Sequence, residues 1–475
     1  MRRPAPPPRK TRQHGIALMV MLAVLIMGIA AALIGSLGST ALKNERQKKT
    51  SEALAQAKDA LIGYAITYGD THSGYVHGYL PCPDPNGTGY GANDEGSSET
   101  CGSKDISAMG RLPWKTLGLP ALLDGSGECL WYAVSGTYKN NPMTDKMMNQ
   151  DTPGLFEILD SSGATVAQNV VAVVFAPAPP LGAQNRAPDG TAPVCGGNYT
   201  PSNYLDNDGT INNAAVSGAA DAVSQFRLGD SALLNDRMIY ITREDIFNAR
   251  NIRAKLDSLT RKAAECIADY GSRNRFNFWP YPINSSDKRL PWSGRLRNPA
   301  NDYWTDGNYD DEDNRLAGRL PYRVNTSQDD TNNHINFPYY QLQLHSTAPY
   351  APINCPSVPE WTAYQPWWTN WKDQLFYAVG ESFSPAGDTS NCAQCLRING
   401  SGAYAAVVIF AGSRLSGQSR TTASERLNFN NYLEGRNLTN ISISSGTDYQ
   451  SDETTDSFND ILYCIDPNLN VAPCP

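Results

Sequence analysis

Histidine is scarce in this chain, with only five residues among 475. No two of them have the His-x-x-x-His spacing of a helical zinc site, and the sequence contains no glycine-rich phosphate-binding loop. Histidine is the side chain most often used for acid–base catalysis and for metal binding near neutral pH. Its scarcity argues against a metalloenzyme or an acid–base enzyme, and we expect a protein that is not an enzyme.

Outside the N-terminus, basic side chains are fewer than acidic ones. A leader, residues 1–15, carries five basic residues and no acidic one: Arg2, Arg3, Arg9, Lys10 and Arg12. The rest of the chain then has 34 basic side chains against 47 acidic ones. Because binding to a phosphate backbone requires clustered lysine and arginine, we expect no nucleic acid among the partners.

Long apolar runs are missing from most of the sequence, and the exception follows the leader directly. The 22 residues from Ile16 to Leu37 carry no charge and are mostly Ile, Leu, Val, Met and Ala. About 20 apolar residues in a helix cross a hydrocarbon core of about 30 Å. Basic residues before such a segment hold the N-terminus in the cytoplasm. We therefore predict a transmembrane helix at 16–38 in a single-pass inner-membrane protein, with the bulk of the chain in the periplasm or on the cell surface or pilus.

The leader and the start of the apolar segment resemble the class III leader of type IV pilins and type II secretion pseudopilins. The resemblance covers about the first 50 residues and rests on the basic leader, on Gly15 at its end and on the uncharged helix after it. It implies that a prepilin peptidase cleaves after Gly15 and that Ile16 becomes the N-methylated first residue. An ordinary signal peptide is the alternative, but its apolar core would have only about 7–15 residues.

One position departs from the family pattern. The family usually has Glu as the fifth mature residue, where this chain has Val20. In the family, that carboxylate neutralises the amino terminus of the neighbouring subunit ahead of it, and an unpaired buried charge would be costly. A subunit at the tip has no neighbour ahead of it. The large minor pseudopilins at the tip also lack this Glu, so Val20 favours a minor subunit at the tip.

The resemblance and Val20 together lead to a functional hypothesis. We expect a non-enzymatic minor pilin-like subunit of a type IV pilus or a type II secretion system. Its partners would be other pilin or pseudopilin subunits, the prepilin peptidase and inner-membrane lipid. The alternative is a single-pass membrane-anchored extracytoplasmic protein that binds a polymer or a receptor.

Short motifs recur in the same order in two halves of the chain, which indicates an internal duplication. We take residues 39–243 as the stalk helix with a first unit, and residues 244–475 as a second unit. Each of four polar segments of the first half has a match in the second half. They are Gly110-Arg111-Leu112-Pro113 with Gly318-Arg319-Leu320-Pro321, Gln184 and Arg186 with Gln418 and Arg420, Asn203-Tyr204 with Asn431-Tyr432, and Asn235-Asp236 with Asn459-Asp460. Leu80-Pro81 is matched with Trp279-Pro280. The alignment also places Tyr132 on Tyr377 and Phe175 on Phe410.

Helix and strand patterns predict an α+β fold. Leu54, Ala57 and Leu61 lie on one face of a helix that continues from the apolar segment, and Thr242 with Asp245 has the capping-box pattern that begins a second helix. Six short β-rich runs read as strands, around Trp131, Val173, Ile239, Phe376, Ile409 and Leu462. We predict a long N-terminal transmembrane and stalk helix followed by two tandem, duplicated units, each a helix on an antiparallel sheet.

The second unit contains an aromatic-rich insert at about 323–372. It holds four tryptophans: Trp361, Trp367, Trp368 and Trp371. Two interpretations remain open. The insert is either a subdomain that covers the second sheet or an exposed face that binds carbohydrate or protein.

Oxygen-rich loops are candidates for calcium. Asp84 and Asn86 lie in one such loop, and Asp206 and Asp208 lie in another, each next to a glycine. Calcium takes six to eight oxygen ligands, which short Asp-rich loops can supply. The competing interpretation is an Asx-type turn, for which the same residues are typical.

All ten cysteines follow the apolar segment, which suits disulfides in an oxidising compartment. We predict two bonds between cysteines that lie close in the sequence, Cys82 with Cys101 and Cys464 with Cys474. We expect Cys392 and Cys395 to bond to different partners, with Cys266 and Cys355 among the candidates.

Overall fold

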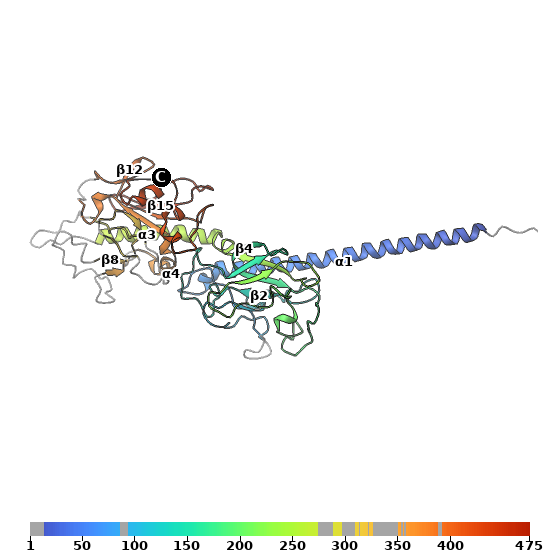
Figure 1. Ribbon diagram of the computed structural model, residues 1–475. Coiled ribbons are helices and arrows are strands. Elements are labelled where there is room, and N and C mark those ends of the chain that lie inside the picture. Colours follow the sequence, from blue (N-terminus) through green and yellow to red (C-terminus); the bar gives the residue numbers. More distant parts are fainter. Residues whose placement is uncertain are drawn as a thin grey trace, which may run out of the picture.

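The chain forms one long helix followed by two globular halves (Figure 1). The computed structural model describes residues 14–85, 94–273, 288–296, 309–312, 314–321, 323–325, 350–352, 355, 358–387 and 392–475. Residues 14–40, 273, 323–325 and 350–352 are described by their backbone alone. We keep the name first half for residues 39–243 and second half for residues 244–475.

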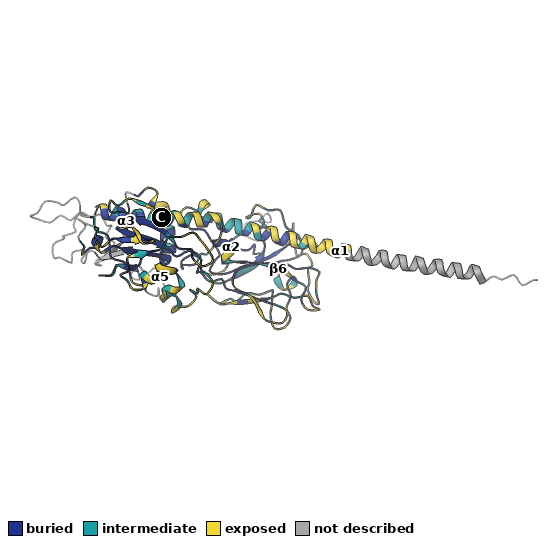
Figure 2. Ribbon diagram, turned by 90° about the horizontal axis from the view of Figure 1, so that it is seen from above, coloured by how far each residue is buried: buried dark blue, intermediate teal, exposed yellow. Residues whose placement is uncertain are grey.

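The helix α1 (His14–Thr71) has 58 residues, which corresponds to a length of about 87 Å. Its last part packs into the first half through six buried side chains at helical spacing: Ala53, Leu54, Ala57, Leu61, Ala65 and Tyr68. Residues 41–49 are exposed (Figure 2). The helix therefore begins outside the globular body and ends inside it, as Figure 1 shows.

The structure corrects the prediction of a membrane span. Among the described residues, no helix is both long enough and apolar enough to cross a membrane. The predicted span rested on 16–38, whose side chains lie outside the described residues. The finding contradicts the predicted single-pass inner-membrane localisation and the transmembrane part of the predicted fold class.

The first half is built on a six-stranded sheet in which β4 is central. The strands are β1 (Ala108–Arg111), β2 (Trp131–Val134), β3 (Phe156–Leu159), β4 (Thr165–Ala176), β5 (Ser224–Arg227) and β6 (Arg237–Thr242). Their order is β1-β2-β4-β3-β5, and β6 also pairs with β4. One face of this sheet packs on α1, because Tyr132, Val134 and Val174 share a hydrophobic core with Leu61.

The second half begins with α2 (Arg243–Phe247) and α3 (Arg250–Arg273), and α3 covers a five-stranded sheet. The predicted capping box is confirmed, since Thr242 Oγ1 accepts a hydrogen bond from Asp245 N and Asp245 accepts one from Thr242 N. The strand order is β16 (Val471–Pro473), β15 (Ile461–Ile465), β13 (Ala406–Phe410), β10 (Leu375–Val379) and β7 (Ala317–Arg319).

Smaller elements complete the second half. A three-stranded sheet contains β12 (Ser401–Tyr404), β11 (Leu396–Ile398) and β14 (Asp448–Tyr449), and β8 (Arg323–Asn325) pairs with β9 (Tyr350–Pro352). Two further helices are α4 (Trp361–Trp371) and α5 (Gly435–Ser442). Short 3-10 turns include η1 (Pro201–Asn203) in the first half and η3 (Lys372–Gln374), η4 (Glu381–Phe383), η5 (Glu425–Leu427) and η6 (Phe429–Asn431) in the second.

The predicted fold class is wrong about the sheets as well. The six predicted strands are present as β2, β4, β6, β10, β13 and β15. However, β5 pairs with β3 in parallel and β14 pairs with β11 in parallel, so the six-stranded and three-stranded sheets are mixed. The five-stranded sheet is antiparallel throughout its described strands. Both parallel pairs follow long connections, which can return a strand in the same direction as its neighbour.

The strand register corrects one of the two predicted residue matches. Tyr132 and Tyr377 are equivalent, because each hydroxyl donates a 3.1 Å hydrogen bond to a proline carbonyl, that of Pro81 and of Pro291 respectively. Tyr132 pairs with Val174 and Tyr377 pairs with Val408.

The structure therefore changes the predicted partners of Phe175 and Pro81. Phe175 corresponds to Ile409, and Phe410 lies on the opposite face of its sheet. A shift of one residue in a strand reverses the face of every side chain, and the shared Val-x-Phe-Ala pattern concealed that shift. Pro81 corresponds to Pro291, whereas residues 279–282, with which we had matched it, lie outside the described residues.

The four tryptophans of α4 are buried, and some of them face the first half. The ring centroid of Trp367 lies 5.0 Å from that of His77, which follows α1. Trp371 packs 5.6 Å from Phe247 and 5.9 Å from Phe410. The described part of the aromatic insert is therefore a packing element between the halves rather than an exposed binding face. Residues 326–349 of the insert lie outside the described residues.

Candidate functional site

The first half contains a buried stack of two arginines on one tyrosine. Arg111 lies at the end of β1, and its Cζ is 5.1 Å from the ring centroid of Tyr204, which directly follows η1. Arg186 Cζ lies 5.0 Å from the same centroid. Arginine over an aromatic ring is stabilising when the pair is removed from water.

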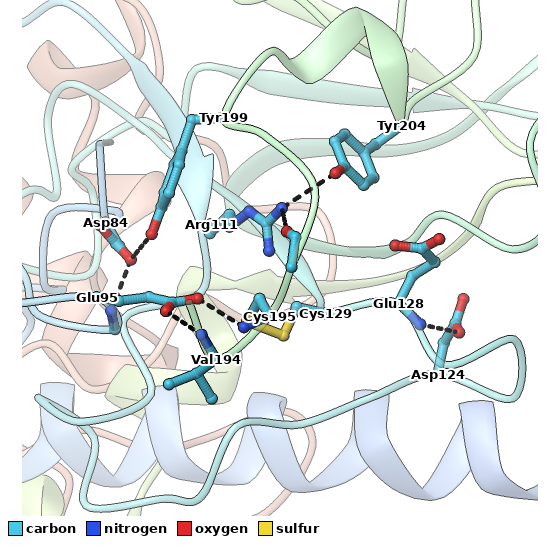
Figure 3. The surroundings of a disulfide bond; sticks show 12 residues. Asp84, Glu95, Arg111, Asp124, Glu128, Cys129, Val194, Cys195, Tyr199 and Tyr204 are labelled. Carbon is cyan, nitrogen blue, oxygen red and sulfur yellow. Dashed lines mark hydrogen bonds between the residues drawn. A yellow bond between two sulfur atoms is a disulfide. The ribbon is translucent and has the colours of Figure 1, made fainter. Parts of the chain in front are cut away.

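Arg111 is held by acceptors from one loop (Figure 3). Its Nη2 donates to the carbonyl oxygens of Gly196 and Asn198, both at 2.8 Å, and to Tyr204 Oη at 3.2 Å. The Cys129–Cys195 disulfide fixes this loop to the residues just before β2. Glu95 also holds the loop, because its carboxylate accepts hydrogen bonds from the amides of Val194 and Cys195.

A pair of buried carboxyl groups lies beside this stack. Asp206 accepts hydrogen bonds from Gln184 Nε2 at 2.9 Å and from Asn235 N at 2.6 Å. Asp236 in turn accepts one from Asp206 N at 2.7 Å. Burial, reinforced by the negative charge of Asp206, raises the pKa of Asp236 well above its usual range.

The second half repeats this arrangement with its own residues. Arg319 and Arg420 lie 5.6 Å and 4.8 Å from the ring centroid of Tyr432, which directly follows η6. Gln418 donates to Glu434 at 2.7 Å, and Glu434 N donates to Asp460 at 3.2 Å. Burial, with the charge of Glu434, raises the pKa of Asp460 well above its usual range.

Most members of the two networks stand in the repeats that the sequence revealed. The exception is the pair Asp206 and Glu434, which changes residue type between the halves and therefore escaped the comparison. Their positions in the sequence could have revealed this pair, since Asp206 lies two residues after Tyr204 and Glu434 lies two residues after Tyr432. In the first half, the guanidinium and carboxyl groups are held mainly by hydrogen bonds with backbone atoms, which fixes the loops around Tyr204.

The oxygen-rich loops do not gather metal ligands in the described part of the chain. Asp84 accepts hydrogen bonds from Gly96 N at 2.7 Å and from Tyr199 Oη at 2.8 Å. Asp208 accepts from the amides of Thr210 and Ile211, as in an Asx turn. Asp206 belongs to the carboxyl pair, and Asn86 lies outside the described residues. Among described residues, no group of three or more His, Cys, Asp or Glu could hold a metal. The turn interpretation therefore fits Asp208, whereas calcium binding in the loop of Asp84 and Asn86 stays a prediction.

The cysteines form five disulfides. The predicted bonds Cys82–Cys101 and Cys464–Cys474 are confirmed. The prediction for Cys392 and Cys395 is wrong, because these two bond to each other and Cys266 bonds to Cys355. A turn at 393–394 brings Cys392 and Cys395 together. The Cys129–Cys195 bond, which supports Arg111, was not predicted.

The three residues singled out for processing and assembly lie near the start of α1. Gly15, Ile16 and Val20 all follow its first residue, His14, and their side chains lie outside the described residues. Cleavage after Gly15, methylation of Ile16 and the effect of Val20 on assembly therefore stay predictions.

No model of a known protein family matches the chain, and neither does any curated protein or solved structure with which it was compared.

Proposed function

We propose that this chain is a non-enzymatic minor subunit of a pilus-like filament, of the type IV pilus or type II secretion kind. The proposal combines the leader and Val20 with the arrangement of α1. Its partners would be other pilin or pseudopilin subunits, and the prepilin peptidase that processes them.

The observation that carries the proposal is the division of α1 into a packed part and a free part. From Ala53 onward, one face of the helix is buried in the first half, whereas residues 41–49 are exposed. A helix that is fixed at one end in a globular head and free at the other can pack beside the same helix of neighbouring subunits. This division is what a filament subunit requires of its stalk.

Contacts from both halves fix the orientation of α1 relative to the globular part of the chain. Lys58 Nζ lies 3.1 Å from Asp245 Oδ2 of α2, and Asn251 of α3 donates to the carbonyl of Ile66 at 2.7 Å. In the first half, Thr50 Oγ1 accepts a hydrogen bond from Gly125 N at 2.9 Å. The stalk and the two halves therefore form one unit, so that a position of α1 in a filament also fixes the position of the head.

We place the subunit at the filament tip. Its two halves both lie towards one end of α1 (Figure 1), and a head of this size is easier to accommodate at an end than in a helical lattice. Val20 agrees with this position, since a tip subunit has no amine ahead of it to neutralise.

The repeated contacts support an origin of the two halves by internal duplication. The same Arg–Tyr–Arg stack and the same bonding of two carboxyl groups occur in each half. The rival function, binding of a polymer through the aromatic insert, is less well supported, because the four tryptophans of α4 are buried.

Gold labelling of filaments tests the proposal. An epitope tag after Pro475 in a strain that assembles filaments should give gold at one end of each fibre, with few particles per fibre. A tag on the major subunit serves as the control and should label the whole length. Filaments that never carry the tagged chain would contradict the proposed function, and labelling along the length would contradict the tip position alone.

A further inference from the structure

One buried histidine lies where the end of α1 meets a helix of the second half. His77 follows α1 in the chain and is 2% exposed. Its ring packs against Trp367 of α4, with the two ring planes at 86°. The contact joins the stalk helix to the second half, so the protonation state of His77 bears on how firmly the two are held together.

Hydrogen bonding determines which nitrogen of this ring carries the proton. The backbone N–H of Gly69, near the end of α1, donates a 3.0 Å hydrogen bond to His77 Nδ1. Because Nδ1 accepts this bond, the neutral ring has its proton on Nε2. A Cβ atom at Gly69 would lie 2.8 Å from Nδ1, so the ring and the helix backbone are in close contact. The ring cannot gain a proton at Nδ1 while this hydrogen bond is present.

The charged groups near the ring give a protonated His77 little compensation. In the described part of the chain they are Asp70 of α1 and Lys255 of α3, whereas α4 contributes the apolar ring of Trp367. Asp70 Oδ2 lies 3.7 Å from His77 Nε2, which exceeds a hydrogen bond, and Nε2 has no hydrogen-bond partner among the described residues.

Asp70 is also a weak partner for electrostatic reasons. Its side chain is 51% exposed, and its other carboxylate oxygen lies 3.7 Å from Lys255 Nζ. Solvent screens such a charge, and Lys255 competes for it. Burial of the ring, assisted by the charge of Lys255, therefore outweighs Asp70 and lowers the pKa of His77 from its ordinary value of 6.5.

We propose that His77 is an acid-sensitive latch between the end of α1 and α4, which the neutral ring holds together and protonation releases. A proton on Nδ1 would face the N–H of Gly69, so that hydrogen bond would be lost. A positive charge would also be buried beside Trp367 without a close carboxylate.

The direction of the pH dependence follows from these contacts. The unfolded chain takes up the proton at a higher pH than the folded chain, so the latch is fully stable above pH 6.5 and loses stability as the pH falls below this value. The Lys58–Asp245 ion pair and the hydrogen bond from Asn251 to Ile66 do not involve His77. We therefore expect a local release of α4 from the end of α1 rather than separation of the halves.

Titration of the imidazole rings by nuclear magnetic resonance tests the first step, on the full chain labelled at histidine. The signal of His77 is identified by its absence from the spectrum of His77→Asn. We expect its titration midpoint to lie below the ordinary value of 6.5. A midpoint at or above 6.5 would overturn the proposal, because the folded chain would then accept the proton without a cost in stability.

Hydrogen exchange tests the release itself. Exchange is measured by mass spectrometry at about pH 7.5 and about pH 5.5 and is corrected for the pH dependence of the chemical exchange step. In the wild type, peptides from α4 and from the end of α1 should exchange faster at the lower pH. Equal corrected rates at the two pH values would overturn the latch, even if His77 titrates at low pH.

The variant His77→Asn separates the latch from other titrating groups. The oxygen of the asparagine side chain can accept the hydrogen bond from Gly69 but does not titrate. In this variant the exchange of both segments should no longer depend on pH. The wild type should unfold at a higher urea concentration than the variant at about pH 7.5, and this advantage should shrink at about pH 5.5.

His72→Asn is the matched control. His72 is only half-buried and lies near the same end of α1, so this variant should keep the pH dependence of the wild type. If His77→Asn does not fold, the contact of the ring with Trp367 identifies the His77 signal, and the wild-type exchange decides. A pH dependence that is unchanged in His77→Asn would overturn the proposal. None of these results depends on filament assembly.

Discussion

Replacement of Ala57 by arginine is expected to lower the free energy of unfolding by about 4 kcal/mol or more. Ala57 is 0% exposed and lies on the face of α1 that packs into the first half, between Leu54 and Leu61. The larger side chain would overpack this core, and its charge would be buried without a partner. Urea denaturation of the full chain, followed by circular dichroism, measures the loss.

Gln56→Arg is the matched control for this variant. Gln56 is the preceding residue of the same helix and is exposed, so the same added charge should change the free energy of unfolding by less than about 0.5 kcal/mol. The variant Ala57→Arg should also fail to enter filaments, because its head would no longer be fixed to the stalk. Equal stability of the two variants would show that α1 does not pack into the first half as described.

Replacement of Trp371 by alanine should cost about 3–5 kcal/mol. Its ring is fully buried between Phe247 of α2 and Phe410 of β13, and truncation leaves a cavity where the second half meets the segment that leads into it. Because both of these partners belong to the second half, we expect the main loss there, so limited proteolysis should cut the second half of the variant sooner than that of the wild type.

Tyr364→Ala, on the same helix, is the control for Trp371→Ala. Tyr364 is only half-buried and should cost clearly less. A Trp371→Ala protein that unfolds at the same urea concentration as the wild type, and resists protease equally, would contradict the assigned role of α4.

Local patterns in the sequence predicted much of the architecture. The apolar spacing of Leu54, Ala57 and Leu61 identified the packed face of α1, and Thr242 with Asp245 identified the start of α2. Both patterns depend on residues close together in the chain, whose geometry local sequence determines. The same is true of the Cys82–Cys101 and Cys464–Cys474 bonds, which close short loops.

Features that depend on distant residues were predicted less well. The register of β13 differs by one residue from the sequence match, because only the opposite strand decides which face Phe410 occupies. The parallel pairing of β5 with β3 depends on a long connection whose path no local pattern shows. The sequence left open whether the tryptophans of α4 cover the second sheet or form a binding face, and only their contacts with Phe247 and His77 decide between these interpretations.

The buried networks were predicted in part. Repeats in the sequence brought Arg186, Tyr204 and Asp236 into correspondence with Arg420, Tyr432 and Asp460, but not as one network. Burial changes the chemistry of such groups, as the raised pKa of Asp236 shows, and burial follows only from the complete fold.

Intact mass spectrometry tests the central claim, that this chain is a processed filament subunit, most directly. The full chain should be purified from cells with an active prepilin peptidase and, in parallel, from cells without one. We predict a mass that lacks residues 1–15 and carries one added methyl group on Ile16 in the first case, and the unprocessed chain in the second. The unprocessed mass in both cases, or a cut near Ser39, would contradict the claim.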